Sequence, residues 1–473
     1  MVERVDLNGK RVLVIGLART GIATALFCAS HGSKVTASDA RSAAELGDSI
    51  EKLRAVGVIL ELGGHPESIL RTQELVIPSP GVPADAPLLQ NAREQSIPVW
   101  SEIELAFRFS QGRLIGITGS NGKTTTTALI EHILRNAGFS TLLAGNIGTP
   151  LIAKIADSND RTFTVAELSS FQLELIESFR PGIAALLNLT PDHLDRHKTL
   201  GAYGAAKARI FENQTAEDFA ILNADDAASA KYAPSRPQVF WFSRRKRVEQ
   251  GAFVAQGKIV FRQCGKEDAI LDCAEISLPG AHNLENILAA TIAVRLAGAQ
   301  PSQIAEGVRS FSGVEHRLEF IAEIHGVRYY NDSKATNVDA TLKALEAFPG
   351  RIIVILGGKD KDSDYTQLRE ALREKAILAL LIGSAAEKIE KQINGTVAIT
   401  RADTLDDAVE LAAQSAHAGD IVLLAPACAS FDQFSNFEHR GRVFKALVQE
   451  LKTGEANKNP ANTERRNAET FGK

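Results

Sequence analysis

The side chains best suited to chemistry lie in one glycine-rich stretch, GITGSNGKTTTT, at residues 116–127. The usual phosphate-loop pattern, G-x-x-x-x-G-K-[ST], would need glycine where this chain has Ile117, so the stretch is a variant of that pattern. Its chemistry is still that of a triphosphate site, because glycines let backbone N–H groups converge on phosphates, Lys123 supplies a positive charge, and the Thr124 hydroxyl can hold Mg²⁺. An apolar strand at 113–118 precedes it and an amphipathic helix follows, which is the context such a loop needs. The stretch predicts binding of ATP or a similar triphosphate.

Two further strands are expected to end near this loop, because the carboxyl ends of parallel strands lie at one edge of a sheet. The strand at 163–168 places Glu167 there, where a carboxylate can hold a metal ion. The strand at 182–189 leads into TPDHLDRH, in which we favour His193 as the functional group. A lone histidine is more often structural, and the spacing of this segment matches no standard zinc site.

One lysine falls where a charge is not expected. In the predicted helix GAYGAAKARIFEN, Tyr203, Lys207, Ile210 and Phe211 are spaced to form a single apolar stripe. A buried lysine needs a partner or must lose its charge. The residues alone favour the simpler outcome, in which the long side chain of Lys207 reaches water.

The N-terminal segment begins with a strand, a helix and a second strand. Gly16, Ala18 and Gly21 have the spacing of a dinucleotide-binding turn with alanine in the middle position, and Asp39 follows at the distance of a ribose-binding acid. A tight strand-to-helix turn without a ligand explains the same residues equally well. A second turn, PSPGVP at 78–83, follows another apolar strand and should line the same edge of the sheet.

The C-terminal third contains three polar loops, NDSKATN, GGKDKDSD and PACASFDQF, each directly after an apolar strand. Such loops should meet at one edge of a parallel sheet, and their mixture of acids, lysines and hydroxyls suits a small zwitterion with carboxylates. Between this region and the glycine-rich loop, residues 236–273 are predicted to be rich in β-strands. Asn283 and Asn286, near the start of the helix that follows, could bind a nucleotide base or cap that helix.

Composition narrows the class of protein. A chain of 473 residues is long enough for about three domains. Its formal net charge of -4 argues against a nucleic-acid partner, and no apolar run approaches the length of a membrane span. The four cysteines form no close pair and are best explained as buried reduced thiols, so we expect a cytoplasmic protein. The polar segment 453–473 is predicted to be a disordered tail.

Eight blocks in order along the chain together resemble the Mur ligases of bacterial cell-wall synthesis. They are GITGSNGKT, ELSSFQLE, LNLTPDHLDRH, AAKARIFEN, LPGAHNLENILAA, VEHRLEF, NDSKATN and PACASFDQFSNFEHRG. The resemblance as a whole runs from about residue 10 to 450. NDSKATN and PACASFDQF are most similar to the D-glutamate-adding members. The DYAH and DNPR types of block, expected in members that add diaminopimelate or lysine, are absent from the sequence.

The resemblance implies an α/β protein of three domains. They are a Rossmann-like domain for a UDP-linked substrate at 1–110, a P-loop ATP-binding domain at 111–313, and a Rossmann-like amino-acid-binding domain at 314–452. It further implies a peptide ligase that cleaves ATP to ADP, with UDP-N-acetylmuramoyl-L-alanine and D-glutamate as the other substrates. Two Mg²⁺ ions, a carbamylated Lys207 and a monomeric protein are expected with it, and NAD is not.

Matching positions carry the following expected roles. The residues expected to bind ATP are Gly119, Asn121, Gly122, Lys123, Thr124, Thr125, Asn283, Arg317 and Asp332. The residues expected to bind the UDP-linked substrate are Leu17, Ala18, Asp39, Arg41, Ser79, Gly81 and Asn146. Asn146 is also expected to lie beside the phosphates. D-glutamate falls to Thr336, Lys361, Ser430 and Phe437, where Lys361 is chosen over its competitor Lys359. The residues expected to bind metal ions are Thr124, Glu167, His193 and Lys207. The residues expected to act in catalysis are Lys123, His193, Lys207 and Lys334.

Three other functions fit parts of the sequence. An oxidoreductase would use the N-terminal turn but has no need of the glycine-rich loop. A nucleotide switch would keep Lys123 but would not need Glu167, His193 and Lys207 together. A folate-polyglutamate ligase is the nearest alternative within the ligases, and dependence on a UDP-linked substrate would separate the two.

Overall fold

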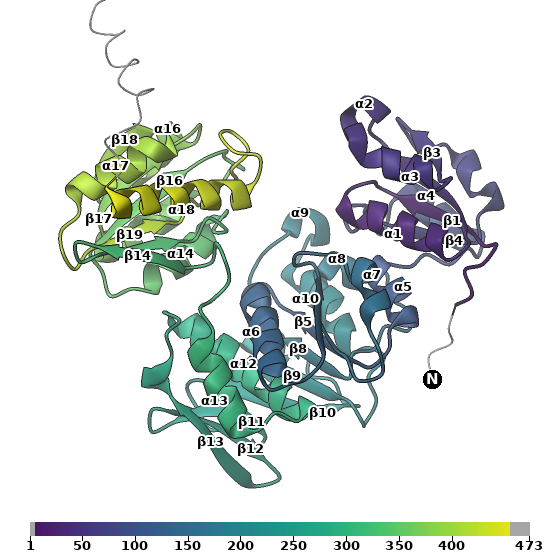
Figure 1. Ribbon diagram of the computed structural model, residues 1–473, viewed down its shortest axis with the longest axis horizontal. Helices are drawn as coiled ribbons and strands as arrows, with labels where there is room; N and C mark the ends of the chain where they lie inside the picture. The colour runs from purple at the N-terminus through teal and green to yellow at the C-terminus, as the bar shows by residue number, and fades with distance from the viewer. Residues whose placement is uncertain (1–4, 455–473) are drawn as a thin grey trace, which may run out of the picture. The chain divides into compact units, whose positions relative to one another are not determined.

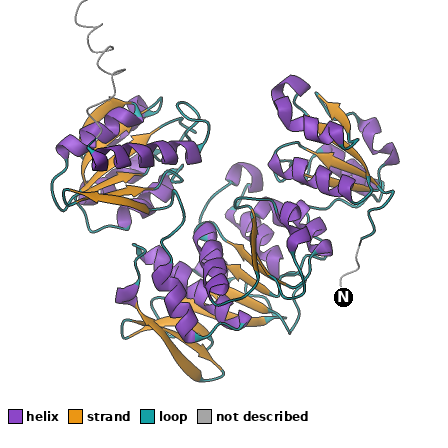
Figure 2. Ribbon diagram, viewed as in Figure 1, coloured by secondary structure: helices purple, strands orange, loops and turns teal. Residues whose placement is uncertain are grey.

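A computed structural model describes residues 5–454, and its helices and strands are labelled in Figure 1. The chain forms two compact units. The first comprises the described residues up to Ile276 together with Leu284–Phe311, and the second comprises Ser277–Asn283 together with the described residues from Ser312 onward. Three separate sheets, of four, nine and six strands, carry the architecture, and helices flank each of them (Figure 2). The fold is therefore of the predicted α/β class, whereas the predicted domain boundaries at 110/111 and 313/314 stay predictions.

The N-terminal sheet has the strand order β3-β2-β1-β4, and all of its pairings are parallel. Its elements are β1 (Arg11–Ile15), α1 (Arg19–Ser30), β2 (Lys34–Asp39), α2 (Ala43–Leu46), η1 (Gly47–Ile50), α3 (Glu51–Ala55), β3 (Ile59–Leu62), η2 (Glu67–Thr72), β4 (Leu75–Pro78), α4 (Pro87–Glu94) and α5 (Glu102–Phe109). Strand β1 is central and almost wholly buried, so the turns that follow β1, β2 and β4 come together at one edge. The predicted opening of strand, helix and strand is confirmed.

The central sheet has the order β13-β12-β11-β10-β9-β8-β5-β7-β6. Its strands are β5 (Arg113–Thr118), β6 (Thr141–Gly145), β7 (Phe163–Glu167), β8 (Ile183–Leu186), β9 (Phe219–Asn223), β10 (Gln238–Ser243), β11 (Gly251–Ala255), β12 (Lys258–Gln263) and β13 (Lys266–Asp272). Its helices are α6 (Lys123–Asn136), α7 (Leu151–Lys154), η3 (Ile155–Asp157), α8 (Ser170–Leu173), α9 (Leu194–His197), α10 (Leu200–Ala208), η4 (Arg209–Phe211), α11 (Ala227–Ala230), η5 (Cys273–Glu275), α12 (Ala281–Ala297) and α13 (Pro301–Ser310). Strand β5 pairs in parallel with both β7 and β8, which brings the ends of all three strands beside the glycine-rich loop.

One strand of this sheet and one helix beside it, β8 and α10, end earlier than the sequence pattern suggests. Strand β8 was expected to reach residue 189 but ends at Leu186, because the next residues bond to the glycine-rich loop and leave the ladder: the Asn121 N–H donates to Asn188 Oδ1 at 2.9 Å. The α10 helix ends at Ala208, and η4 continues it as a tighter turn. The β-rich segment after residue 236 is present as strands β10 to β13.

The C-terminal sheet has the order β14-β15-β19-β16-β17-β18, with only β14 antiparallel to its neighbour. Its elements are β14 (Glu319–Ile324), β15 (Val327–Asn331), α14 (Val338–Glu346), β16 (Ile352–Gly357), η6 (Tyr365–Leu368), α15 (Arg369–Lys375), β17 (Ala376–Ile382), α16 (Ala386–Ile393), β18 (Ala398–Asp403), α17 (Leu405–Ser415), β19 (Ile421–Leu424) and α18 (Phe437–Thr453). Because β15, β19 and β16 are neighbours, the three polar loops that follow them share one edge, as predicted. The tail predicted to be disordered lies outside the described residues from position 455 onward.

Within residues 5–454, no helix combines the length and the apolar character that crossing a membrane requires.

Helix α5 anchors the chain between the first two sheets with two buried carboxylates. Glu104 accepts hydrogen bonds from three successive backbone N–H groups, Glu177 to Phe179, and from Arg108 Nε at 2.8 Å. Glu102 accepts from the Ile152 N–H at 2.7 Å, and its burial, only partly offset by that bond and by Gln172, raises its pKa to about 7. The two carboxylates thus have different electrostatic surroundings.

Glu102 should make stability depend on pH. Its folded-state pKa lies above the unfolded value, so the folded state holds this proton more tightly and the protein loses stability as pH rises from about 4.5 to about 7. Glu102→Gln removes that loss, which is on the order of 3 kcal/mol at most. The thermal midpoint of the variant relative to the wild type should therefore increase between about pH 5 and about pH 8.

The matched control is Glu104→Gln, which removes the nearer and buried one of the two carboxylates paired with Arg108 and should lower the midpoint at neutral pH. A midpoint difference between Glu102→Gln and the wild type that stays constant with pH would contradict the assignment.

Candidate functional site

The glycine-rich loop is held open for a ligand by its glycines. Gly119 and Gly122 have φ of 148° and 82°, in the region that favours glycine, and a Cβ on Gly122 would lie 2.2 Å from Asn286 Oδ1. Helix α6 begins at the next residue, Lys123, so its N-terminal N–H groups and the positive end of its dipole lie at the loop. This cradle suits phosphates.

The side chain of Asn188 holds the glycine-rich loop in place through hydrogen bonds to Asn121. The sequence analysis did not identify this residue. Its Oδ1 accepts from the Asn121 N–H, and its Nδ2 donates to the Asn121 carbonyl at 3.1 Å. The Ser120 N–H donates to the Asn188 carbonyl, and Ser120 Oγ donates to the Thr190 carbonyl at 3.0 Å. The only signal in the sequence was the position of Asn188 at the end of an apolar run, directly before the polar block TPDHLDRH.

Two lysines converge on one carbonyl in this loop. Lys123 Nζ donates to the carbonyls of Gly119 and Ser120 at 2.9 and 2.8 Å, and Lys207 Nζ donates to the same Gly119 carbonyl at 2.8 Å. Lys207 is only 2 % exposed, with its ammonium 4.6 Å from the centre of the Tyr203 ring. The side chain therefore does not reach water, unlike the outcome that the residues alone favoured.

The surroundings of Lys207 favour its neutral form. Burial, and next the positive charge of Lys123, hold the pKa of Lys207 well below its usual range, while the carboxylates of Asp192 and Glu167 act in the opposite direction. A neutral amine is a nucleophile, whereas an ammonium is not. The site therefore contains a buried lysine that is harder to protonate than an exposed one.

The predicted metal-binding groups lie around the same strand ends. Glu167 ends β7 and is 2 % exposed, next to Ile117 in the pairing with β5, and Thr124 lies in the first turn of α6 at 1 % exposure. Asn146 Nδ2 donates to Glu167 Oε1 at 2.8 Å, so Asn146 lies beside this acid and the ladder of β6. A buried carboxylate and a hydroxyl at a helix start are oxygen ligands of the kind Mg²⁺ takes. The donor set fits that ion.

His193 occupies a more open position. It has φ of 51°, starts helix α9, and its side chain is 49 % exposed, with Nε2 at 3.6 Å from Asp192 Oδ2. Its ring centre lies 4.9 Å from that of Phe171 and 6.4 Å from that of Tyr203, the residue on which Lys207 rests. His197, in contrast, is buried and bonded to Ser170 Oγ, which is a structural environment.

The N-terminal turns form a second group. The Leu17 N–H donates to Asp39 Oδ2 at 2.6 Å, and Arg41 pairs with both Asp39 oxygens. The hydrogen bond from Arg41 comes first among the causes that lower the pKa of Asp39, so the carboxylate stays ionised. Ser79 Oγ donates to the Gly16 carbonyl at 2.7 Å and joins the turn after β4 to the turn after β1.

Arg196 joins this group to the central region. Its guanidinium donates to the carbonyls of Pro80 and Val82 at 3.2 and 3.1 Å and pairs with Glu174 at 2.5 Å. It also lies over the Phe171 ring, 4.4 Å from its centre. The loop that contains Gly81 is therefore held by backbone contacts to a cation from the segment that follows His193.

In the second unit, the loop after β15 places three predicted residues together. Asp332 is nearly buried, and that burial raises its pKa to about 7 against the opposing charges of Arg317 and Lys334. Lys334 Nζ lies 5.4 Å from the centre of the Phe437 ring, at the start of α18. The Thr336 N–H donates to the Lys334 carbonyl at 2.8 Å, which makes a tight turn.

Arg440 organises this edge, and the sequence analysis missed it. The side chain is fully buried on α18 and donates to Ser333 Oγ and to the carbonyls of Ser333 and Cys428, at 2.8 to 3.2 Å. It thereby ties the loop after β15 to the loop after β19, which holds Ser430. Among residues 5–454, no carboxylate forms an ion pair with this guanidinium. The motif FEHRG contained the arginine, but only its burial reveals the role.

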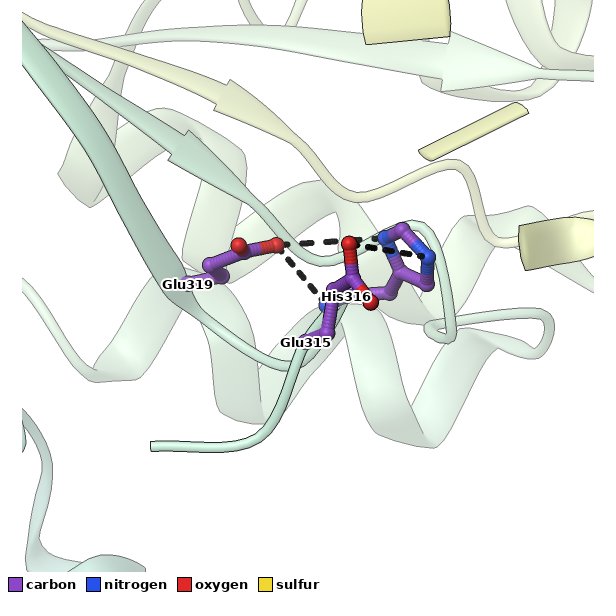
Figure 3. Close-up of side chains that lie close together, drawn as sticks. All are labelled: Glu315, His316 and Glu319. Atoms are coloured by element: carbon purple, nitrogen blue, oxygen red, sulfur yellow. Dashed lines mark hydrogen bonds and ion pairs between the residues drawn. The ribbon is translucent and has the colours of Figure 1, made fainter. Parts of the chain in front are cut away.

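The segment that holds Arg317 is fixed by a cluster shown in Figure 3. The ligand atoms of Glu315, His316 and Glu319 lie within 4.8 Å of one another, which resembles a metal site. Lys445 Nζ, however, pairs with both carboxylates, at 3.2 Å to Glu315 Oε1, and supplies the positive charge that the acids need. His316 Nδ1 accepts from Asn331 Nδ2 at 2.9 Å when the imidazole is neutral. The cluster is an anchor for Arg317 rather than a metal centre.

The predicted residues thus fall into groups. One surrounds the glycine-rich loop, one lies at the N-terminal turns, and one lies at the edge of the C-terminal sheet. Asn146 belongs to the first of these, beside Glu167. Asn283 and Asn286 are on one helix but in different compact units, with Asn283 Nδ2 donating to the Pro279 carbonyl at 2.7 Å and Asn286 Oδ1 accepting from Thr126 Oγ1 at 3.3 Å.

Comparison with family models covers most of the chain. Residues 10–101 match the model described as "Mur ligase MurD-like, N-terminal domain", residues 117–294 match "Mur ligase middle domain", and residues 316–428 match "Mur ligase, glutamate ligase domain".

Similar named proteins extend over nearly the whole length. The protein named UDP-N-acetylmuramoylalanine--D-glutamate ligase in Koribacter versatilis is 55% identical over 447 residues, 94% of this chain and 98% of that protein. The protein of the same name in Solibacter usitatus is 51% identical over 94% of this chain and 99% of that protein.

Solved structures share the fold at low identity. UDP-N-acetylmuramate-alanine ligase MurC from Thermotoga maritima superposes with a TM-score of 0.57 at 20% identity, covering 93% of this chain and 99% of that one. MurF ligase from the same organism, in complex with ADP, gives 0.59 at 17% identity, covering 95% and 98%.

The loop glycines give a direct test of the phosphate cradle. Gly122→Ala would bring a methyl group onto Asn286 and should lower ATP affinity at least about tenfold, measured by titration calorimetry. Gly138→Ala is the matched control, because Gly138 has φ of 88° at the other end of α6 and open space around its Cβ position. Both variants carry similar backbone strain. Equal affinities in the two variants would contradict the cradle.

Proposed function

This chain belongs to the Mur ligase family, and we propose that it joins D-glutamate to UDP-N-acetylmuramoyl-L-alanine with cleavage of ATP to ADP, in the synthesis of peptidoglycan precursors. The observation that carries the proposal is the convergence of Lys123 and the buried Lys207 on the Gly119 carbonyl, inside a glycine cradle at the start of a helix. The names of relatives that are 51% and 55% identical over 94% of the chain support the choice of amino acid.

The chemistry that such a ligase needs is activation of a carboxylate. An oxygen of the UDP-substrate carboxylate attacks the γ-phosphorus of ATP, and the bond between that phosphorus and the β,γ-bridging oxygen breaks. ADP departs as the leaving group, and the substrate carboxylate has become an acyl phosphate. The amine of D-glutamate then attacks the acyl carbon, the carbon–oxygen bond to phosphate breaks, and the amine releases a proton. Phosphate and an amide are the products. Phosphorylation is needed because a carboxylate oxygen is a poor leaving group.

The central residues would hold the phosphates in line with the attacking carboxylate. Lys123 and the N–H groups in the first turn of α6, including those of Thr124 and Thr125, would bind the β- and γ-phosphates. Gly119, Asn121 and Gly122 would shape the loop around them, with the Asn121 N–H held by Asn188. Thr124, Glu167 and His193 would hold Mg²⁺, whose chemistry when bound is to neutralise charge on the transferred phosphoryl group. Asn146 would orient Glu167 through the hydrogen bond that it already makes.

Lys207 would act as a carbamate. Its neutral amine, favoured by burial and by Lys123, can add to CO₂, forming a nitrogen–carbon bond and releasing a proton. The product is an anion in place of a neutral amine, so it would attract Lys123 and add an oxygen ligand for a second Mg²⁺. The need for a neutral amine explains why the lysine lies in an apolar stripe.

The N-terminal turns would bind the UDP moiety. Leu17 and Ala18 lie directly before the start of α1, and Arg41, Ser79 and Gly81 lie on the neighbouring turns. Asp39 accepts the Leu17 N–H and both arms of Arg41, so its carboxylate keeps this turn in shape. Contacts of Arg196 with the Ser79–Val82 turn support a link between this site and the phosphate cradle.

The edge of the C-terminal sheet would bind the amino acid and part of the nucleotide. Thr336, Lys361, Ser430 and Phe437 would contact D-glutamate, and Lys334 would lie at the reacting groups. Arg317 would bind the γ-phosphate, Asp332 the ribose, and Asn283 the adenine. The mixture of two lysines and several hydroxyls at one edge supports a ligand with carboxylates.

The overall reaction can be measured as phosphate release from ATP and Mg²⁺ by the full chain, with product mass as a second readout. Release should require both UDP-N-acetylmuramoyl-L-alanine and D-glutamate, and L-glutamate should not replace the D-enantiomer. A folyl substrate in place of the UDP-linked one tests the alternative ligase. Release that is indifferent to the UDP-linked substrate would refute the proposal.

Lys207→Ala should reduce the rate at least about a hundredfold, because it removes the anion proposed to hold the second metal ion. A short carboxylic acid such as acetate or propionate should restore part of the activity of Lys207→Ala, since it can occupy the vacated space and supply the missing oxygen. Lys207→Arg is the control, because arginine fills the space but forms no carbamate and should not be rescued. Full activity in Lys207→Ala would refute the carbamate. The monomeric state and the cytoplasmic location stay predictions.

A further inference from the structure

The loop that follows β16 is closed by one carboxylate. Asp360 Oδ1 accepts hydrogen bonds from Tyr365 Oη at 2.7 Å and from the Ser363 N–H at 3.2 Å, and Asp360 Oδ2 accepts from Lys388 Nζ at 2.7 Å. Burial acts to raise the pKa of Asp360, but the hydrogen bonds from Lys388 and Tyr365 bring it down to about 2. The carboxylate is therefore ionised at neutral pH, and Lys361 lies on the loop that it closes.

The direction of the hydrogen bonds follows from this ionisation. An ionised carboxylate only accepts, so the Tyr365 hydroxyl donates to Asp360. The same hydroxyl lies 2.9 Å from Cys428 Sγ, so the Cys428 thiol donates its hydrogen to the tyrosine oxygen. Both residues are at most 1 % exposed. Cys428, Tyr365, Asp360 and Lys388 thus form one directed chain from the loop after β19 to helix α16.

A backbone bridge joins the same two loops at a second place. The Lys359 N–H donates to the Ala429 carbonyl at 2.8 Å, and the Ala429 N–H donates to the Lys359 carbonyl at 3.2 Å. Lys361 lies between this bridge and Tyr365, whereas Ser430 directly follows the bridge on the opposite loop. The separation of Lys361 and Ser430 is therefore set by two joints, one of backbone and one of side chains.

The charges of the loop also need compensation. Asp360 and Asp362 flank Lys361, and uncompensated carboxylates there would repel a dicarboxylate ligand and attract the lysine to themselves. Lys388 pairs with both, at 2.7 Å to Asp360 and 3.2 Å to Asp362. Lys361 is thereby left available for a ligand anion.

We infer that Tyr365 and Lys388 are positioning residues for the amino-acid substrate: Tyr365 sets Lys361 against Ser430, and Lys388 cancels the acids beside Lys361. The inference rests on the proposed function, since it takes the ligand of this edge to be D-glutamate. Neither residue is expected to touch the substrate. They act through the loop that presents Lys361.

Tyr365→Phe tests the side-chain joint with the loss of one oxygen atom. It removes one of the three donors to Asp360, leaves the buried Cys428 thiol without its acceptor, and should raise the KM for D-glutamate about tenfold. The kcat at saturating D-glutamate and the KM values for ATP and the UDP-linked substrate should stay within about twofold of the wild type. Tyr329→Phe is the matched control, because Tyr329 is 2 % exposed in a different apolar cluster of the same sheet.

Lys388→Gln tests the charge. It should also raise the KM for D-glutamate, and the increase should shrink in about 0.5 M salt, where charges are screened within a few ångströms. Cys428→Ala combined with Tyr365→Phe completes a double-mutant cycle, and the combined effect on KM should be smaller than the two single effects multiplied.

The outcomes separate this inference from the proposed function. A wild-type protein that releases no phosphate in response to D-glutamate would refute the proposed function itself. If the wild type responds but Tyr365→Phe keeps the same KM for D-glutamate, the positioning role is wrong. A decrease in kcat together with a similar increase in all three KM values and a lowered thermal midpoint would show a purely structural role. That result would also overturn the inference.

Discussion

The phosphate site depends on one unfavourable contact, the approach of two lysine side chains to a single carbonyl oxygen. Lys123 and Lys207 both donate to Gly119, and only Lys123 has a route to water. Two ammonium groups on one carbonyl oxygen, one of them buried, would repel each other. The surrounding structure, from the Tyr203 ring to the glycines of the loop, is compatible with this contact because Lys207 can give up its proton.

One topological rule places most of the candidate site residues. In each of the three sheets, parallel strands end at one edge, and most of the candidate side chains follow those ends. Glu167 ends its strand beside the glycine-rich loop because β5 and β7 pair, and the loops that hold Lys334 and Ser430 leave neighbouring strand ends because β15 and β19 pair. The inner strands such as β5, β7, β8, β16 and β19 are buried and largely apolar, so the candidate functional groups lie in the loops, which are free to differ in sequence.

Local sequence patterns could predict these loops, because strand, turn and helix signals act over a few residues. They predicted the cradle of Lys123, the strand end at Glu167 and the three loops of the C-terminal sheet. They could not reveal Asn188, Arg440 or the pairing of Tyr365 with Cys428, since each depends on partners 60 to more than 100 residues away. The apolar stripe of α10 marked Lys207, but its burial became evident only from the packing of Tyr203 and Gly119 around it.

Asn146 shows the same limit in another form. Matching positions gave it a role toward the UDP-linked substrate and a place beside the phosphates, and the structure places it on Glu167. The hydrogen bond joins neighbouring strands, so it follows from the order β7-β6 at the edge of the sheet. Strand order is a property of the whole domain and is not written in any short segment.

The buried guanidinium of Arg440 differs from the buried amine of Lys207 in how firmly it holds its proton. Burial lowers its pKa only to about 10, so it remains protonated throughout the physiological range. With carbonyls and a hydroxyl as its partners, it places a constant positive potential beneath the loops of the C-terminal sheet, shielded from mobile ions by the protein around it. The chain therefore contains one buried cation whose charge is adjustable and one whose charge is permanent.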